Sequence, residues 1–355
     1  MAKIFASVLI DTYNQERFIE QAIVSVLEQD FPAADREIIV VDDGSTDRTA
    51  EIVKKFGPRV RLLRKENGGQ ASAFNAGIPE CKGEIIAFLD GDDWWAPGKL
   101  RRVVDTMNSD PSIGMVGHAI VESFEEGAER IIALEHSERL RLNSVAEADV
   151  FRLHRCYLGA SRLTIRAELA REILPVPELL IFEADEYLFT MAAAFADVVI
   201  LSDPLTHYRI HGANLFLAAR REDGGLRRKQ HVLEALDSAL DRDLRSRGLA
   251  EAVVCRVVEL VRAEAAQLRL MLDGGSPRET YRTENTIYRI LHGDATRKQK
   301  LFRHITMIPA LVLPPKLFYA SRGWLARQPW YVDARREYLP VPKFTRVSAA
   351  RHVQE

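Results

Sequence analysis

Three carboxylates stand within four positions of the stretch AFLDGDDWWAPGKL, which runs from Ala87 to Leu100. They are Asp90, Asp92 and Asp93, and like charges this close repel one another unless something neutralises them. Mg²⁺ and Mn²⁺ prefer hard oxygen ligands, usually one or two carboxylates together with phosphate oxygens of a substrate. The cluster therefore predicts a divalent cation beside a phosphate, and an acidic turn exposed to water is the plain alternative.

Other short stretches also carry residues suited to ligand binding. Asp42 and Asp43 end an apolar run, where a carboxylate can accept hydrogen bonds from a ribose hydroxyl or a base N–H. They can instead cap the next helix, and both roles are compatible if Asp43 faces the ligand. Gly68 and Gly69 precede a helix whose first N–H groups can cradle a phosphate, or they simply form a tight turn. Tyr13 can stack on a base, although a tyrosine in a loop is otherwise unremarkable.

A second group of acids, Glu183, Asp185 and Glu186, surrounds the expected start of a helix. A carboxylate there can act as a general base, whereas acids in a first helical turn are also stabilised by the helix dipole. His207 and His211 are four residues apart, but nothing in the sequence makes that segment a helix, so we do not expect a zinc pair. We expect one of the two to reach the metal or the diphosphate.

Short apolar runs alternate with helical patterns over the first hundred residues. The expected strands are Phe5–Ile10, Glu37–Asp43, Val60–Arg64 and Glu84–Asp90. Strands buried on both faces and joined by helices predict a parallel sheet with right-handed crossovers. Ligands of such sheets bind at the carboxyl ends of the strands, and every polar loop described above falls at that edge. This convergence is the strongest argument for a ligand site that the residues themselves offer.

The later elements are less regular. We expect strands over 113–124, 156–165 and 198–203, a helix over 184–195, and a strand end with a loop over 205–215. Long helices are expected from residue 226 to about 292, with a break at 273–280. The expected helix starts are Ser45 or Thr46 as the N-cap of the second helix, and Ser276 and Pro277 after the break.

The composition excludes several classes of protein. Of 355 residues, 47% are apolar and 28% are charged, which is typical of a folded, water-soluble chain. The net charge of −2 gives no support to nucleic-acid binding. The three cysteines are far apart and lack metal-ligand spacing, so a reducing compartment is expected. We expect neither a signal peptide nor a membrane-spanning helix, and we expect a cytoplasmic location, with contact to the inner membrane face as an option.

Four ordered stretches resemble the family 2 glycosyltransferases. They are SVLIDTYNQERFIEQAIVSVLEQDF, EIIVVDDGSTDRTAEIV, NGGQASAFNAGI and IIAFLDGDDWWAPGKL, with weaker support from EADEYLF and LTHYRIHGANL. The resemblance is dense over residues 5–107 and extends to about residue 215. It implies an α/β GT-A fold with a Rossmann-like, mainly parallel sheet. It also implies a nucleotide-diphospho-sugar donor, most commonly a UDP-sugar, a divalent cation (Mn²⁺ or Mg²⁺) and inversion at the anomeric carbon.

The resemblance also implies residue roles. The implied donor-binding residues are Asp11, Tyr13, Asp43, Asn67, Gln70, Asp90 and Asp92. The implied metal ligands are Asp92, Asp93 and His211, and the choice among the aspartates stays open. Asp185 occupies the position of the catalytic base. Two departures matter: Asp11 stands where relatives often have proline, and Ala184 precedes the base where relatives often have glutamate.

Other function classes are less well supported. A nucleotidyltransferase or a dehydrogenase would carry a glycine-rich phosphate loop after the first strand, which DTYNQERF does not provide. A non-catalytic nucleotide-sugar-binding protein stays open because of Ala184. No Gln-x-x-Arg-Trp processivity motif is present, so we expect transfer of one sugar at a time, in surface polysaccharide or glycoconjugate synthesis, to a glycan or lipid-linked acceptor.

The expected domain organisation has two parts. Residues 1–222 form the catalytic domain, in which 1–110 bind the nucleotide sugar and 111–222 face the acceptor. Residues 223–355 form a mainly helical region. An uncharged run, Ile305–Pro315, is flanked there by basic and aromatic residues, which suits peripheral contact with a membrane through residues 298–331. The alternative is that this segment docks on the catalytic domain or on a second subunit of a homo-oligomer.

Overall fold

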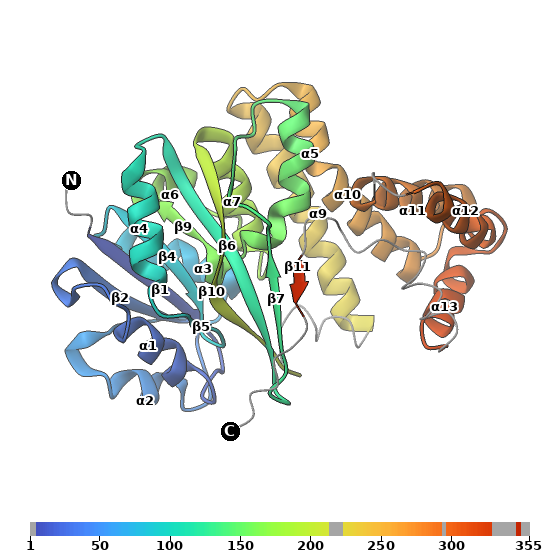
Figure 1. Cartoon of the computed structure of the whole chain (residues 1–355). Coiled ribbons are helices and arrows are strands. Elements are labelled where there is room, and N and C mark those ends of the chain that lie inside the picture. The colour runs from blue at the N-terminus through green and yellow to red at the C-terminus, as the bar shows by residue number, and fades with distance from the viewer. Residues whose placement is uncertain (1–4, 213–222, 293–295, 329–345, 349–355) are drawn as a thin grey trace.

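The first four apolar runs form the parallel half of the central sheet, as the sequence predicts (Figure 1). The computed structural model describes residues 5–212, 223–292, 296–328 and 346–348. The four strands are β1 (Ala6–Thr12), β2 (Arg36–Asp42), β3 (Arg61–Arg64) and β4 (Ile85–Asp90). They pair in parallel in the order β3-β2-β1-β4. Their carboxyl ends therefore meet at one edge, where the predicted polar loops begin.

Both faces of these strands are covered, which explains why the runs are apolar throughout. Val8 and Ile10 pack on one face with α1 and α4, whereas Leu9 faces the opposite side and packs with α3. These helices are α1 (Ile19–Leu27), α3 (Gly69–Gly77) and α4 (Lys99–Ser109). Three short 3₁₀ turns complete this half, namely η1 (Ala33–Asp35), η2 (Gly57–Arg59) and η3 (Ile78–Glu80).

Helix α2 (Thr49–Lys54) begins later than the sequence predicts. Neither Ser45 nor Thr46 caps it, because both residues are engaged by Asn14 of the first loop. The Ser45 hydroxyl accepts a hydrogen bond from the Asn14 N–H at 2.9 Å, and the Asn14 side-chain oxygen accepts one from the Thr46 N–H at 2.8 Å. The expected N-cap was therefore wrong, and the two loops are joined to each other instead.

The second half of the sheet is mixed. Its strands are β5 (Trp94–Trp95), β6 (Ile113–Phe124), β7 (Glu129–Ala133), β8 (Glu138–Leu140), β9 (Thr164–Arg166) and β10 (Asp197–Ile210). Strand β9 joins the halves by pairing antiparallel with both β4 and β6. Strand β10 runs parallel to β6, and β11 (Arg346–Ser348) adds to the outer edge of β7. The chain thus returns to the sheet close to its C-terminus.

Two expectations for this half were wrong. Residues 156–165 do not form one strand, because η4 (Arg155–Tyr157) and η5 (Ala160–Arg162) occupy most of the segment and only its end enters β9. The segments 198–203 and 205–215 were expected as separate elements, but they are continuous as far as residue 210. They form the single strand β10, in which register shifts around Pro204 absorb the proline. Residues 213–215 lie outside the described part of the chain.

The remaining helices cover one face of the sheet and then extend away from it as an arm (Figure 1). They are α5 (Val145–His154), α6 (Ala167–Ile173), α7 (Ala184–Phe195), α9 (Asp223–Ser246), α10 (Glu251–Leu272), α11 (Pro277–Leu291), α12 (Arg297–Val312) and α13 (Pro315–Leu325). Helices α5, α7, α9 and α10 contribute to the same hydrophobic core as β1, β2 and β4. The predicted start of α11 is confirmed, since Ser276 caps it in a capping box with Glu279 and Pro277 follows.

A buried carboxylate holds the last three helices of the arm together. Glu284 of α11 is 3% exposed. It accepts hydrogen bonds from Gln267 Nε2 at 2.6 Å and from Arg303 Nη2 at 3.1 Å, and it also pairs with Arg322. Burial alone would raise the pKa of Glu284, but Arg322, Gln267 and Arg303 together bring the pKa below its ordinary value of 4.5. The ionised carboxylate therefore stabilises the packing of α12 and α13 on α10 and α11.

Replacing Glu284 by glutamine should destabilise the arm. We expect the free energy of unfolding at pH 7 to fall by about 1–3 kcal/mol, because Arg303 is left largely buried without its counter-ion. A carboxylate with a lowered folded-state pKa stabilises fully above 4.5 and loses that effect as the pH falls below 4.5. Urea unfolding should therefore show a difference between native protein and variant that narrows in acid. Glu126→Gln, at an exposed turn, is the matched control and should change neither the free energy of unfolding at pH 7 nor its dependence on pH.

Candidate active site

Two aspartates from neighbouring strands face each other at the carboxyl edge of the sheet. Asp11 near the end of β1 is in register with Asp90 at the end of β4. Burial, then the charge of Asp90, raises the pKa of Asp11 well above its ordinary value. Burial, then Asp92 and Asp185, raises the pKa of Asp90 to about 7. Among the described residues Asp11 Oδ1 has no hydrogen-bond partner, so ionisation of both carboxyls of this pair is unfavourable unless positive charge lies beside them.

The neighbouring aspartates of the cluster have different surroundings. Asp93 is 1% exposed, and its carboxylate accepts hydrogen bonds from the Arg209 N–H at 2.9 Å and from Ser161 Oγ at 2.5 Å. Asp92 instead contacts His211, with Oδ2 and Nε2 3.0 Å apart, and Gln15 Nε2 at 3.3 Å. Asp93 therefore ties the cluster to β10 and η5. Asp92 carries the more available carboxylate, which favours it over Asp93 as a direct ligand of a cation.

The two histidines of the expected pair differ in their contacts, and one of them lies against the acidic cluster. His207 stacks on Trp94, with ring centroids 4.7 Å apart and planes at 7°, and its Nδ1 lies 3.2 Å from Ser123 Oγ. His211 is the residue that reaches Asp92. Both lie at the end of β10 or just beyond it, not on a helix. The segment that carries both histidines is therefore a strand and its end.

Turn η5 connects the acidic cluster to the predicted base, and sequence reasoning missed it. The Ser161 hydroxyl lies 2.5 Å from Asp93 Oδ2 and 3.1 Å from Asp90 Oδ2, and it accepts a hydrogen bond from the Asp90 N–H. The preceding N–H, that of Ala160, donates to Asp185 Oδ2 at 3.0 Å. The only sequence signal for this turn was Gly159 inside the segment expected to be a strand. A single short turn thus positions three of the predicted site carboxylates.

Asp185 lies at the start of α7, beside the acidic cluster. Its oxygens accept hydrogen bonds from the N–H groups of Ala160 and Glu186 at 3.0 and 2.9 Å. Burial raises the pKa of Asp185 against these hydrogen bonds. Its charge in turn raises the pKa of Asp11 and of Asp90, which means that the helix start and the strand ends share one electrostatic environment.

The other acids at this helix start are less suited to act as a base. Glu186 Oε1 lies 2.5 Å from Arg155 Nη1, and Arg155 also pairs with Glu264 of α10. Burial, Glu186 and Asp185 raise the pKa of Glu183 to about 8, so Glu183 is mostly protonated at neutral pH. Of the three acids that the sequence left open, the structure therefore favours Asp185.

The loop after β3 is folded against the second strand. The Asp43 carboxylate accepts hydrogen bonds from the N–H groups of Gly68 and Gly69, at 3.0 and 2.6 Å, and from Lys65 Nζ at 2.7 Å. Asn67 Nδ2 donates to the Asp43 carbonyl oxygen at 3.0 Å. Asp43 therefore caps the start of α3, the glycine-rich turn that the sequence suggested for phosphate.

Gln70 holds the start of α7, beside Asp185. Its side-chain oxygen accepts a hydrogen bond from the Ala184 N–H at 3.0 Å, and its backbone N–H donates to the Ile181 carbonyl. Gly69 has φ +82°, and a Cβ there would lie 2.5 Å from Ile181 Cα, so only glycine allows this close approach. Tyr13, by contrast, is 40% exposed in the first loop, and its ring is accessible for stacking.

The residues present fit a divalent cation only together with a ligand. Among the described residues, no group of three or more His, Cys, Asp or Glu side chains is arranged to hold a metal ion. Asp92 and His211 provide two donor atoms 3.0 Å apart, and Asp11 Oδ1 lacks a hydrogen-bond partner in the described chain. Mg²⁺ and Mn²⁺ sites often combine such a small protein donor set with phosphate oxygens, so the arrangement suits a nucleotide-bound cation better than a free one.

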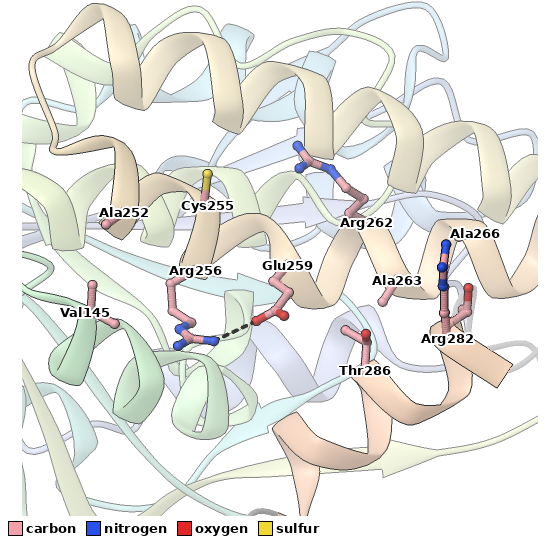
Figure 2. A pocket seen from close by; sticks show the side chains of 11 residues that line it. Val145, Ala252, Cys255, Arg256, Glu259, Arg262, Ala263, Ala266, Arg282 and Thr286 are labelled. Carbon is pink, nitrogen blue, oxygen red and sulfur yellow. Dashed lines mark hydrogen bonds and ion pairs between the residues drawn. The ribbon is translucent and has the colours of Figure 1, made fainter. Parts of the chain in front are cut away.

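A separate cavity of about 630 Å³ lies between α5, α10 and α11, and none of the predicted site residues lines it (Figure 2). Two of its arginines are paired with acids. Arg256 Nη1 lies 3.1 Å from Glu259, and Arg262 Nε lies 3.0 Å from Asp237. The third arginine of the lining, Arg282, adds positive charge, in contrast to the acidic cluster at the strand ends.

Comparison with known proteins agrees with this geometry. Residues 7–170 match the family model for glycosyl transferase family 2. An uncharacterized glycosyltransferase of Nostoc sp. is 31% identical over 220 residues, which cover 60% of this chain and 67% of that relative. TarS of Staphylococcus aureus, a poly(ribitol-phosphate) β-N-acetylglucosaminyltransferase, is 33% identical over 140 residues, or 36% of this chain and 24% of TarS. The chain thus spans about two thirds of the first relative and a smaller part of the second.

Two solved structures share the fold. TarS residues 1–349 in complex with UDP superpose with a TM-score of 0.52 at 18% identity, covering 90% of this chain and 91% of that one. The mannosyltransferase PcManGT of Pyrobaculum calidifontis, in complex with GDP-Man and Mn²⁺, gives a TM-score of 0.54 at 20% identity, covering 95% and 84%. The expected GT-A architecture with a helical C-terminal region is confirmed.

The different environments of Asp92 and Asp93 predict different effects of truncation. Asp93→Ala should lower the free energy of unfolding by about 1–3 kcal/mol, because the Arg209 N–H and Ser161 hydroxyl lose a buried acceptor. Asp92→Ala should change it little, since it removes a charge that disfavours ionisation of Asp90. Urea unfolding in the presence of a chelator measures both. Equal losses for the two variants would contradict the structural role given to Asp93.

Proposed function

Because the chain belongs to glycosyltransferase family 2 and is a glycosyltransferase, we propose that it transfers one sugar at a time from a UDP-sugar to an acceptor hydroxyl, with inversion at the anomeric carbon. The observation that carries this proposal is turn η5, in which the Ala160 N–H holds Asp185 at 3.0 Å and the Ser161 hydroxyl lies 3.1 Å from Asp90 Oδ2. This contact supports a site in which Asp185 would accept the proton and the carboxylate cluster would bind the cation, as direct displacement of a diphosphate requires.

The donor side of the proposed site consists of the loops that follow β1, β2 and β3. We assign Asp11, Tyr13 and Asp43 to the nucleoside, with Tyr13 stacking on the base and Asp43 accepting hydrogen bonds. Asn67 also holds Asp43 through its carbonyl oxygen and Gln70 also holds the start of α7, and both are proposed to contact the donor. TarS and PcManGT bind UDP and GDP-Man respectively, so the choice of uridine is a proposal that a competition experiment decides.

The cation belongs to the same proposal. Asp92 and His211 would hold Mn²⁺ or Mg²⁺, and Asp90 would accept hydrogen bonds from the donor sugar or its phosphates. When bound, the cation supplies positive charge that stabilises the diphosphate as it leaves. Asp93 keeps Asp92 in place through the backbone, because its own carboxylate is occupied by Arg209 and Ser161.

Asp185 is proposed to take the proton of the acceptor hydroxyl as that oxygen attacks the anomeric carbon. The N–H groups of Ala160 and Glu186 hold its carboxylate in a fixed orientation, and the raised pKa makes it a stronger base than an exposed aspartate. The acceptor is proposed to be a glycan or a lipid-linked glycan in surface polysaccharide or glycoconjugate synthesis, in line with the polymeric acceptor in the name of TarS.

Binding of UDP should depend on a divalent cation. In MnCl₂, isothermal titration calorimetry with native protein should give an affinity for UDP at least about tenfold higher than in excess chelator. Asp92→Asn keeps the hydrogen bond to His211 but removes the charge, so its affinity in MnCl₂ should fall to the chelator value. Asp105→Asn, exposed on α4, is the control. Equal affinity of native protein in manganese and in chelator would refute the proposed cation site, and preference for GDP would refute the uridine assignment.

Asp185→Asn should lower turnover by about two to four orders of magnitude with little change in UDP affinity. Because Asp185 must be ionised to act, and its pKa lies above the ordinary 3.8, turnover of native protein should rise with pH through that raised value. The variant should lack this rise. Turnover is measured as UDP release with a panel of acceptors.

Glu183→Gln is the matched control for this experiment, since Glu183 lies at the same helix start and is already mostly neutral at pH 7. We expect it to retain turnover close to that of native protein. If Asp185→Asn keeps native turnover instead, the base is Glu183 or Glu186. Binding of a UDP-sugar by native protein, without release of UDP in the presence of any acceptor, would favour a protein that binds nucleotide sugars without catalysing transfer.

A further inference from the structure

Helices α12 and α13 form the end of the arm, far from the parallel strands (Figure 1). One side of this pair is packed against the rest of the arm. Met307 and Ala310 of α12 and Phe318 of α13 form a small core, at most 3% exposed. Arg303 and Arg322 on the same side bind Glu284. This inner side therefore packs on α10 and α11 of the same arm, whereas the alternative expected from the sequence was the catalytic domain or a second subunit.

The opposite side of α12 is an apolar surface without a partner in the described chain. Leu301, Ile305, Ile308 and Val312 recur at helical spacing and are between 57% and 72% exposed. Leu317 and Trp324 of α13 are 60% and 61% exposed. We call these six residues the outer face. Scattered exposed apolar residues are normal, but a continuous row along one helix marks a site of interaction.

The charge of this segment is one-sided. No aspartate or glutamate occurs from Thr296 to Gln328. The same stretch contains seven lysines and arginines, namely Arg297, Lys298, Lys300, Arg303, Lys316, Arg322 and Arg327. Lys298 and Lys300 are exposed, and neither makes an ion pair with another described residue. Since the whole chain has a net charge of −2, the rest of the protein is negative and the arm end is strongly positive.

We propose that the outer face binds the surface of a membrane that contains anionic lipids. A helix with an apolar row bordered by lysine and arginine lies in the plane of the interface, with the row buried about 5–10 Å into the headgroup and acyl boundary. Anionic headgroups attract the bordering cations. Trp324 suits the same depth, because indole rings prefer the boundary between headgroups and chains. This proposal does not depend on the reaction that the site catalyses.

The charge argues against a second copy as the occupant. In a symmetric dimer the same surface meets itself, which would bring together the five cations of each segment that are not paired with Glu284, with no acid in either segment. Helix α12 has 16 residues and contains Pro309. No helix in the described chain is both long and apolar enough to cross a bilayer, so the contact we propose is peripheral. Of the span 298–331 expected from the sequence, residues 329–331 lie outside the described part.

Flotation of the full-length protein tests the proposal. Vesicles of phosphatidylcholine with phosphatidylglycerol should carry native protein to the top of a density gradient, and vesicles of phosphatidylcholine alone should not. Replacing Leu301, Ile305 and Ile308 by glutamine should reduce the bound fraction roughly tenfold or more, since three apolar side chains leave the interface. Leu179→Gln, at a position 73% exposed outside the arm, is the matched control and should float like native protein.

A second arm of the experiment separates charge from apolar contact. Lys298→Gln with Lys300→Gln should weaken binding at an ionic strength on the order of 0.1 M and matter less at about 1 M, where charges are screened. Emission of Trp324 should shift to shorter wavelength with anionic vesicles, and Trp324→Phe should remove that shift. Circular dichroism verifies that all variants fold.

Three outcomes would overturn the proposal. The first is that native protein stays at the bottom of the gradient with anionic vesicles, which would mean that it does not bind them. The triple glutamine variant can float as well as native protein, which would place the lipid contact elsewhere in the chain. Sedimentation velocity can show a dimer that the triple variant converts to a monomer while neither binds vesicles, which would make the outer face a subunit interface.

Discussion

Concentrated negative charge at the carboxyl edge of the sheet is the constraint on which the rest of the structure depends. Asp93 is buried there, Asp11, Asp90 and Asp185 are partly buried, and the loss of contact with water raises the pKa of each. The protein offsets this with few donors, chiefly the Ser161 hydroxyl and the N–H groups of Ala160 and Arg209. The fold thus maintains an arrangement that is electrostatically unfavourable on its own and that positive charge from a ligand would relieve.

The surrounding elements are arranged around this charge. Turn η5 places Ala160 against Asp185, the proposed base, and Ser161 against the acidic cluster. The short strand β9 follows this turn and pairs with both halves of the sheet. Asp43 fixes the start of α3 by binding the Gly68 N–H. Gln70, two residues later, fixes the start of α7. A continuous chain of contacts therefore runs from the proposed nucleoside loop to the proposed base, without passing through the acidic cluster.

Most of the parallel half and the convergence of its loops could be predicted from sequence. Strands buried on both faces are apolar throughout, and parallel order alone brings Asp11 beside Asp90. Helix α7 and the start of α11 carry local signals and were also predicted. Ser161 was not, because its role depends on a turn whose residues resemble a strand. The different partners of Asp93 and Asp92, and the single strand β10 that continues through Pro204, depend likewise on tertiary contacts that no local pattern encodes.

Because the two halves share a core, the segment matched by the family model is not the whole folded unit. The family match ends at residue 170, yet the helix that carries Asp185 is held from outside that segment. Tyr187 donates to Asp243 of α9 at 2.9 Å, and Arg155 bridges Glu186 to Glu264 of α10. The unit recognised by sequence is smaller than the unit that folds. A truncation of this chain at residue 170 would therefore remove α7 together with the α9 and α10 residues that hold it.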